Sequence, residues 1–135
     1  MSFSLSSFES DDITCFDIIK AFYALTDNEL EVLSCVNKAQ PLDIRSIISI
    51  IPKDRATISR SIKKLMAIGF VRSDKITLDR GGYKFMYSSL SMREIREKLT
   101  LNIESISKRM TAAISNLTEE KCTAMYESVL AKYKK

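Results

Sequence analysis

Histidine is absent from this chain, and its three cysteines, Cys15, Cys35 and Cys122, form no Cys-x-x-Cys pair. Structural zinc sites are built from clustered cysteine and histidine ligands, so we expect no bound metal, and no motif indicates another cofactor. Each cysteine lies within an apolar helical pattern, which predicts a buried thiol because free cysteines are commonly buried. The alternative is a redox switch, which requires an exposed thiol with a lowered pKa.

The sequence also has no long apolar run, and it contains only three glycines and two prolines. A transmembrane helix needs about 20 consecutive apolar residues, and a secretory signal needs an apolar segment of its own. We therefore expect a cytoplasmic protein that does not bind membranes. Scarce glycine and proline fit a mostly helical chain, and 135 residues with 45% hydrophobic and 28% charged content suit one globular domain.

Catalytic signatures are missing as well. The chain has no histidine to act as a base, no nucleophile elbow, no glycine-rich phosphate loop and no acid pair at a typical spacing. We therefore expect that this protein is not an enzyme.

Charge is present but unevenly distributed. Residues 1–40 carry a net charge of −5, residues 41–90 carry +6 and residues 91–135 carry +3. A concentrated basic region is the electrostatic footprint of a protein that binds a polyanion. We expect the acidic first segment to face away from that partner.

Residues 44–84 have the pattern of a winged helix-turn-helix, in which two short helices are followed by a hairpin. Asp43 is placed to cap the first helix, which ends before Pro52. The second helix, here called the recognition helix, covers about residues 54–68, from its cap at Asp54 to a terminating Gly69. Its apolar residues share one helical face, and they are Ile58, Ile62, Leu65 and Met66.

The opposite face of the recognition helix is polar and basic. It holds Arg55, Thr57, Ser59, Arg60, Lys63 and Lys64. A helix with a polar, basic face of this kind can lie in the major groove of double-stranded DNA. There we expect the first four side chains near base edges and adjoining phosphates, and the two lysines on the backbone. For each single residue, solvated surface is the alternative.

The hairpin, here called the wing, is predicted over about residues 76–87. Its first strand begins at Phe70 with a kink near residues 74–75, and glycines at residues 81–82 supply the turn. We expect Arg80 at the tip to enter or flank the minor groove, where arginine is favoured. The phosphate candidates outside the recognition helix are Lys53, Lys84, Arg45 and Ser46.

Capped helices are predicted on both sides of this motif. Residues 11–24 form one helix, and Thr26 with Glu29 opens a second as a capping box. Ser91 with Glu94 opens a long helix, and Thr118 caps the last one. The long helix has a narrow apolar stripe that needs a partner helix, so we expect a homodimer. The dimer residues are Ile95, Leu99, Ile103, Ile106, Met110 and Leu117.

Residues 54–74 and 78–95 resemble the MarR/TrmB-like winged-helix transcriptional regulators, especially compact archaeal ones. The resemblance covers about residues 25–117 and rests on two places, the helix-to-wing junction and the wing tip. The residues that carry it are Leu65, Gly69, Phe70, Val71, Arg72, Arg80 and Gly81. It implies a dimer formed by terminal helices, with two recognition helices reading a pseudo-palindrome. A small-molecule effector of unknown identity could bind beside Phe22, Tyr23 and Tyr87, for which core packing is the alternative.

Together these features predict a mainly α fold with a small β-hairpin (α+β). We expect a flexible N-terminus at residues 1–10, a winged-helix DNA-binding domain at residues 11–90 and helical dimerisation at residues 91–135. The expected function is sequence-specific regulation of transcription on double-stranded DNA. Two alternatives stay open, a protein–protein interaction module and an architectural DNA-binding module without base specificity.

Overall fold

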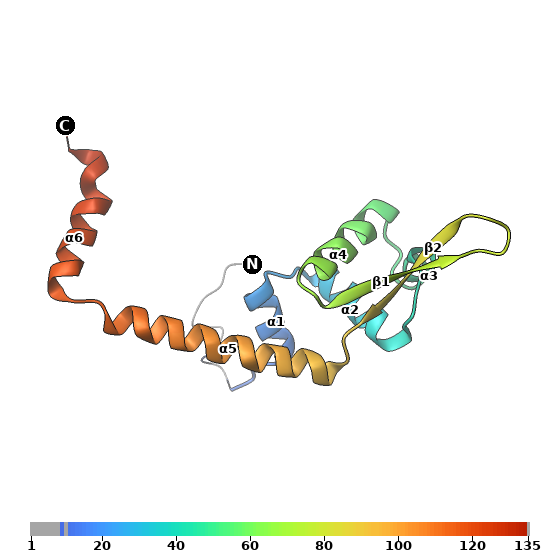
Figure 1. The fold of residues 1–135 in the computed structure, drawn as a ribbon, viewed down its shortest axis with the longest axis horizontal. Coiled ribbons are helices and arrows are strands. Elements are labelled where there is room, and N and C mark those ends of the chain that lie inside the picture. Colours follow the sequence, from blue (N-terminus) through green and yellow to red (C-terminus); the bar gives the residue numbers. More distant parts are fainter. Residues whose placement is uncertain (1–8, 10, 135) are drawn as a thin grey trace. The chain divides into compact units, whose positions relative to one another are not determined.

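The computed structural model describes residue 9 and residues 11–134, and it is mainly helical with one hairpin, as predicted (Figure 1). The elements in chain order are α1 Cys15–Tyr23, α2 Asp27–Ala39, α3 Ile44–Ile50, α4 Arg55–Ala67, β1 Val71–Thr77, β2 Tyr83–Ser89, α5 Met92–Ser115, α6 Glu119–Leu130 and a 3-10 turn Ala131–Tyr133. The chain divides inside α5 into a first unit that ends at Arg96 and a second that begins at Glu97. The flexible segment expected at residues 1–10 lies outside the described residues, apart from residue 9.

Local capping explains where most helices begin. The predicted capping box of Thr26 and Glu29 opens α2, and both of its backbone bonds are present. The Asp43 side chain accepts a 2.8 Å hydrogen bond from the amide of Ser46 and starts α3 as expected. Each such cap satisfies an amide that the helix itself leaves unpaired.

The start of the first helix was predicted incorrectly. The sequence favours Asp11 as its beginning, but α1 starts at Cys15, after a capping box made by Thr14 and Asp17. The two boxes predicted farther along the chain show the same spacing between a hydroxyl residue and an acid, so this signal was present in the sequence. α1 ends at Tyr23, and its C-cap Ala24 adopts a left-handed conformation with φ of 52°.

The core of the first unit forms where α2, α4 and the start of the wing pack together. The fully buried side chains include Val32, Val36, Ile47, Ile58, Ile62, Leu65 and Phe70. Burying one such side chain contributes about 1.5–3 kcal/mol to folding. Met66 departs from the predicted apolar face, because it is 38% exposed and lies at the edge of the buried stripe.

The wing is a regular antiparallel hairpin. Its register runs without a bulge from Val71 opposite Ser89 to Thr77 opposite Tyr83. The kink predicted near residues 74–75 is therefore wrong, and the wing strands begin earlier than residue 76. Continuous pairing with β2 overrides the weak strand preference of aspartate and lysine at these positions.

Two backbone features fix the ends of the wing. Gly69, at φ of 85°, ends α4, and the amide of Phe70 donates back to the Leu65 carbonyl at 2.9 Å. At the tip, Gly81 and Gly82 have φ of 87° and 80°, as the turn prediction requires. Positive φ is costly for any residue with a side chain, which is why glycine occupies these turns.

The second unit contains most of α5, with α6 and the terminal turn. The predicted capping box of Ser91 and Glu94 opens α5, with bonds of 3.2 and 3.1 Å, and Thr118 caps α6 as expected. Along the described part of the chain, no helix is both long enough and apolar enough to span a membrane.

Candidate nucleic-acid interface

The recognition helix α4 has one buried face and one exposed face. Ile58, Ser61, Ile62 and Leu65 are buried against the core. Arg55, Arg60 and Lys63 are exposed on the other side, with Ser59 partly exposed beside them. Ala56 also lies on this outer face, one helical turn before Arg60. The sequence interpretation missed Ala56, although helical spacing alone identifies it, and its small side chain leaves room for a close approach.

The outer face is rich in unused hydrogen-bond donors. Among residues 9 and 11–134, Arg55, Ser59 and Lys63 have no hydrogen-bond or ion-pair partner. The guanidinium of Arg60 lies 3.4 Å from the Thr57 hydroxyl. A set of cations held on a rigid helix without internal partners can bind an external anion.

The start of α4 differs in one detail from the expectation. Asp54 is the N-cap residue, but its carboxylate makes no bond to a backbone amide and instead accepts a hydrogen bond from the Thr57 hydroxyl. This hydrogen bond lowers the pKa of Asp54. Thr57 therefore already has an internal partner, unlike Ser59.

Lys53 and Lys64, predicted as phosphate contacts, are both attached to the first turn of α2. The Lys64 ammonium lies 3.0 Å from Glu29 and also donates to the carbonyl of Ala24. Lys53 donates to the Asn28 side chain and lies 3.6 Å from the Glu31 carboxylate. Lys53 lies just before α4 and Lys64 lies in its last turn, so their bonds to α2 hold both ends of the recognition helix.

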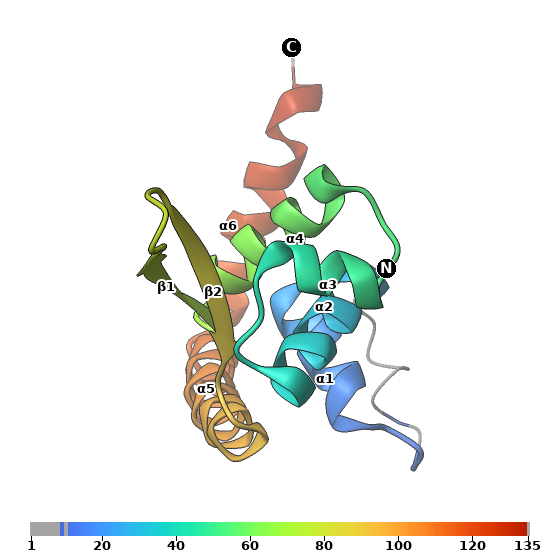
Figure 2. The same ribbon diagram turned by 90° about the vertical axis from the view of Figure 1, so that its right-hand side faces the viewer.

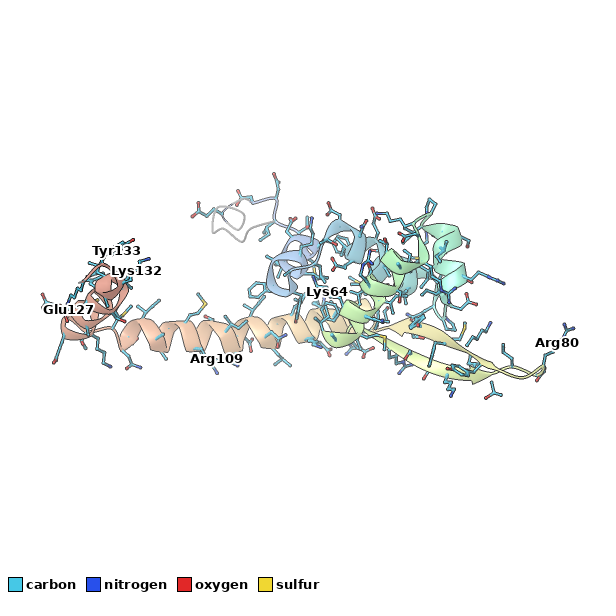
Figure 3. The ribbon with its side chains drawn as sticks, turned by 90° about the horizontal axis from the view of Figure 1, so that it is seen from above. Lys64, Arg80, Arg109, Glu127, Lys132 and Tyr133 are labelled. Carbon is cyan, nitrogen blue, oxygen red and sulfur yellow. The ribbon has the colours of Figure 1, made fainter. Side chains whose placement is uncertain are left out.

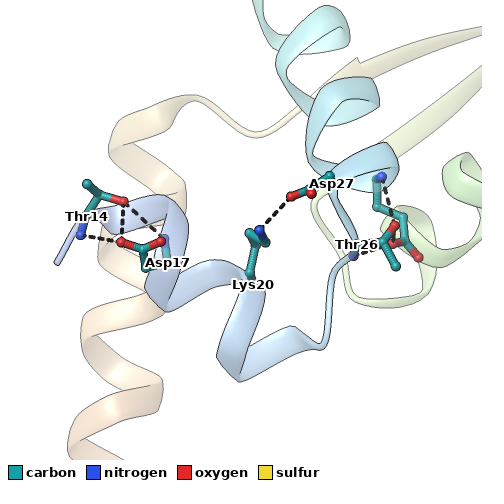
Figure 4. A network of polar contacts seen from close by, with 6 residues as sticks. Thr14, Asp17, Lys20, Thr26 and Asp27 are labelled. Atoms are coloured by element: carbon teal, nitrogen blue, oxygen red, sulfur yellow. Dashed lines mark hydrogen bonds and ion pairs between the residues drawn. The ribbon is translucent and has the colours of Figure 1, made fainter. Parts of the chain in front are cut away.

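The first turn of α2 is thus an acidic cluster that binds lysines from several elements. Lys20 of α1 reaches Asp27 at 2.6 Å, beside the Thr26 cap (Figure 4). Burial alone would raise the pKa of the Glu29 carboxyl, but hydrogen bonds from Thr26 and Lys64 outweigh burial and lower it. Glu29 is 9% exposed, which makes its pairing with Lys64 a largely internal interaction.

The wing stands beside α3 and α4 (Figure 2). Arg80 lies at its far end (Figure 3), exposed and without a partner in the described part of the chain. Lys84 lies 3.6 Å from Asp43, so it joins the wing to the start of α3. Leu42 and Tyr87 exchange backbone hydrogen bonds of 3.0 and 2.7 Å, which attach the wing to the loop before α3.

The remaining predicted contacts lie on α3. Arg45 is exposed, whereas Ser46 is partly buried and uses its amide to bond Asp43. The side chain of Arg45 is therefore available to an external partner, but the backbone amide of Ser46 is not.

The cysteines do not share one environment. Cys35 is buried as expected, and burial raises the pKa of its thiol. Cys15 is exposed and Cys122 is partly exposed, so the prediction of three buried thiols is wrong. In α1 the core position belongs to Ile19, which leaves the first residue of the helix in solvent. The described residues contain no cluster of three or more potential metal ligands.

The three aromatics proposed to line an effector pocket, Phe22, Tyr23 and Tyr87, are all partly exposed. The ring of Tyr23 meets that of Phe70 edge-on, with centroids 4.8 Å apart. A surface groove of about 730 Å³ lies elsewhere, between α2 and the segment from Ile50 to Lys53. Phe22, Tyr23 and Tyr87 do not line this groove.

Comparison with known proteins agrees with this geometry. Residues 25–80 match the model of the MarR family. This part of the chain is therefore similar to the MarR family of winged-helix proteins.

Three relatives show how far the similarity extends. The uncharacterized protein MJ1503 of Methanocaldococcus jannaschii is 24% identical over 82% of this chain and 85% of its own length. YhjH of Bacillus subtilis, an uncharacterized HTH-type transcriptional regulator, is 31% identical over 54% of this chain but only 42% of its own. A structure described as a possible transcriptional regulator from Methanosarcina mazei has a TM-score of 0.68 and 24% identity, covering 79% of this chain and 91% of that one. This last likeness supports the fold of the MarR-like chain.

Proposed function

We propose that this MarR-like chain regulates transcription by binding double-stranded DNA in a sequence-specific manner as a homodimer. In this proposal α4 lies in the major groove and the wing follows the adjacent minor groove or backbone. The observation that carries it is the outer face of α4, where cations and a hydroxyl have no partner among the residues that the structure describes. An α-helix fits the major groove of DNA, and these side chains can hydrogen-bond with base edges and phosphates there.

The contacts divide by role. Arg55, Ser59 and Arg60 approach base edges, and Lys63 neutralises a backbone phosphate. Arg80 approaches the minor groove from the wing tip. Lys53 and Lys64 orient α4 through their bonds to α2, and the phosphate contacts expected of them stay a prediction.

Lys84 and Thr57, which were also predicted to contact DNA, already have partners within the protein. The Lys84 ammonium pairs with the Asp43 carboxylate, and the Thr57 hydroxyl donates to the Asp54 carboxylate. Lys84 is 44% exposed at its side chain and keeps two further ammonium hydrogens for a phosphate.

The dimer is supported by apolar side chains on the second unit, which the single chain leaves in water. Ile103, Met110 and Leu117 are 37%, 58% and 47% exposed, and Ile106 is partly exposed. Ile95 and Leu99, predicted with them, are only 1% and 5% exposed and leave little surface for a second chain. Further exposed apolar residues on these helices are Leu101, Ile114, Met125, Val129 and Leu130. Exposed surface of this kind marks an association site.

Fluorescence anisotropy with a labelled duplex of mixed sequence tests DNA binding. We expect the affinity to fall linearly with the logarithm of salt concentration, because phosphate contacts release counterions. The double variant Arg55→Ala/Lys63→Ala should bind weakly, whereas Lys38→Ala, an exposed lysine on α2, should bind like the wild type. Equal binding by all three proteins would contradict an interface on α4.

A further inference from the structure

The two faces of the wing differ in chemistry. Because the register has no bulge, alternate residues point to opposite sides and paired residues share a side. One side carries Lys84 opposite Ile76, and Lys84 is joined to the start of α3. The other side carries Phe85 opposite Lys75, followed by Tyr83 toward the tip. We call Lys75, Tyr83 and Phe85 the aromatic face of the wing.

The aromatic face is ordered but exposed. The rings of Tyr83 and Phe85 meet edge-on with centroids 5.5 Å apart. The Lys75 ammonium lies 4.0 Å from the centroid of the Tyr83 ring, a cation–π arrangement. Even so, Tyr83 and Phe85 are 56% and 42% exposed. Two adjacent aromatic rings at the outer end of a hairpin therefore present a preformed apolar surface to solvent.

The surroundings of this face are cationic. Residues 75–84 contain three cations, Lys75, Arg80 and Lys84, and one carboxylate, Asp79. Beyond the strands, a Cβ added at Gly81 or Gly82 would meet no atom within 4 Å, so there is open space beside both glycines of the tip. A partner for this surface must offer apolar patches between negative charges. The groove wall of duplex DNA has this character, with deoxyribose faces between phosphates.

We propose that the aromatic face binds the sugar–phosphate wall of duplex DNA. The rings of Tyr83 and Phe85 pack on deoxyribose, while Lys75 and Arg80 pair with the flanking phosphates. This inference rests on the proposed DNA-binding function and adds three contact residues to it. It makes the wing an apolar as well as an electrostatic contact, and a contact with sugars is independent of base sequence.

A tryptophan probe tests the contact directly, since the chain contains no tryptophan of its own. In Phe85→Trp the indole should report burial by a change in emission when duplex DNA is added to saturation, followed in parallel by anisotropy of the labelled DNA. The matched control is Ile76→Trp, on the other side of the same hairpin and 41% exposed in the wild type. Its emission should change little.

Affinity measurements give a second readout. Tyr83→Ala/Phe85→Ala should weaken duplex binding on the order of tenfold without changing the salt slope, because aromatic contacts with nucleotides are each worth several-fold and no charge is lost. Lys75→Ala should lower the salt slope by about one phosphate contact. Circular dichroism and melting curves check that these surface variants remain folded.

The outcomes separate this inference from the proposed function. If the wild type binds no duplex, both fail. If the wild type binds, Arg60→Ala binds weakly and Tyr83→Ala/Phe85→Ala binds like the wild type, only the aromatic contact is contradicted. A Phe85→Trp emission shift that depends on protein concentration without DNA would also overturn it, because a second chain would then cover the face.

Discussion

Lysines near the recognition helix fall into two groups, and their partners distinguish them. Lys63 is exposed on the outer face of α4 with no partner among the described residues. Lys64, its neighbour, points to the other side and pairs with the buried carboxylate of Glu29. Adjacent residues on a helix are separated by about 100°, so one lysine can serve an external ligand while the next supports the fold.

Removing the Glu29 carboxylate should destabilise the fold. Glu29→Ala takes away the capping-box acceptor of α2 and leaves the Lys64 ammonium, 36% exposed at its side chain, without its partner. We expect a loss of about 1–3 kcal/mol in the free energy of unfolding, measured by urea denaturation. Glu31→Ala, which removes an exposed carboxylate, should lose less than about 0.5 kcal/mol. Equal losses in the two variants would argue against an internal ion pair at Glu29.

Stability should fall in mild acid. The folded state holds the pKa of Glu29 below its ordinary value of 4.5 and that of Asp43 below 3.8, the latter mainly through hydrogen bonds from Ser46. Lowered values mean that the unfolded chain binds more protons, so stability is fully present above these ordinary values and is lost as pH falls below them. Urea midpoints measured between about pH 7 and pH 3 check this, and Glu29→Gln should reduce the pH dependence. A midpoint that stays constant over that range would contradict the prediction.

The recognition helix is held in place by its buried inner face and by contacts at both of its ends. Its inner face is fixed by Ile58, Ile62 and Leu65, and its ends are held to α2 through Lys53 and Lys64. A helix held at both ends presents its outer side chains in a fixed orientation. This orientation is what base readout requires, because a side chain must meet a base edge at hydrogen-bond distance.

Arginine and lysine on the outer face should affect binding differently. Arg60→Ala should cost about 1–3 kcal/mol on a preferred site and much less on an unrelated duplex, because a base contact depends on sequence. Lys63→Ala should weaken all duplexes by a similar factor and lower the salt slope. Anisotropy titrations on two duplexes at several salt concentrations measure both effects. Equal, sequence-independent losses in both variants would remove the base-reading role of Arg60.

Across the whole molecule, local signals were predicted best. The capping pairs of Thr26 with Glu29 and Ser91 with Glu94 act over three residues, so the sequence alone specifies them. The hydrophobic spacing of α4 and the glycine that ends it are equally local. The sequence therefore predicted the order and type of the elements.

Signals that depend on distant partners were missed. Lys53 and Lys64 have partners 25 and 40 residues away, at Asn28 and Ala24, and only the folded chain brings these groups together. The sequence shows two lysines in a basic region, which fits phosphate contacts equally well. The straight strand through residues 74–75 is a similar case, because pairing with β2 decides it.

Self-association is a prediction about the whole protein. Sedimentation should find a dimer at micromolar concentration, since the exposed apolar residues of α5 and α6 would otherwise remain in water. Met110→Glu, which places a charge at a position 58% exposed in the single chain, should shift the protein toward the monomer. A wild-type monomer at high micromolar concentration would contradict the proposed dimer.

Selection from a pool of random duplexes at near-physiological salt, followed by sequencing, tests sequence-specific binding most directly. The account predicts enrichment of a pseudo-palindrome with half-sites about one helical turn apart, because a two-fold dimer presents two copies of α4 to one side of the DNA. Binding without enrichment would contradict base reading and indicate an architectural, backbone-binding protein. Absence of binding would contradict the DNA-binding proposal itself and favour a protein-interaction module.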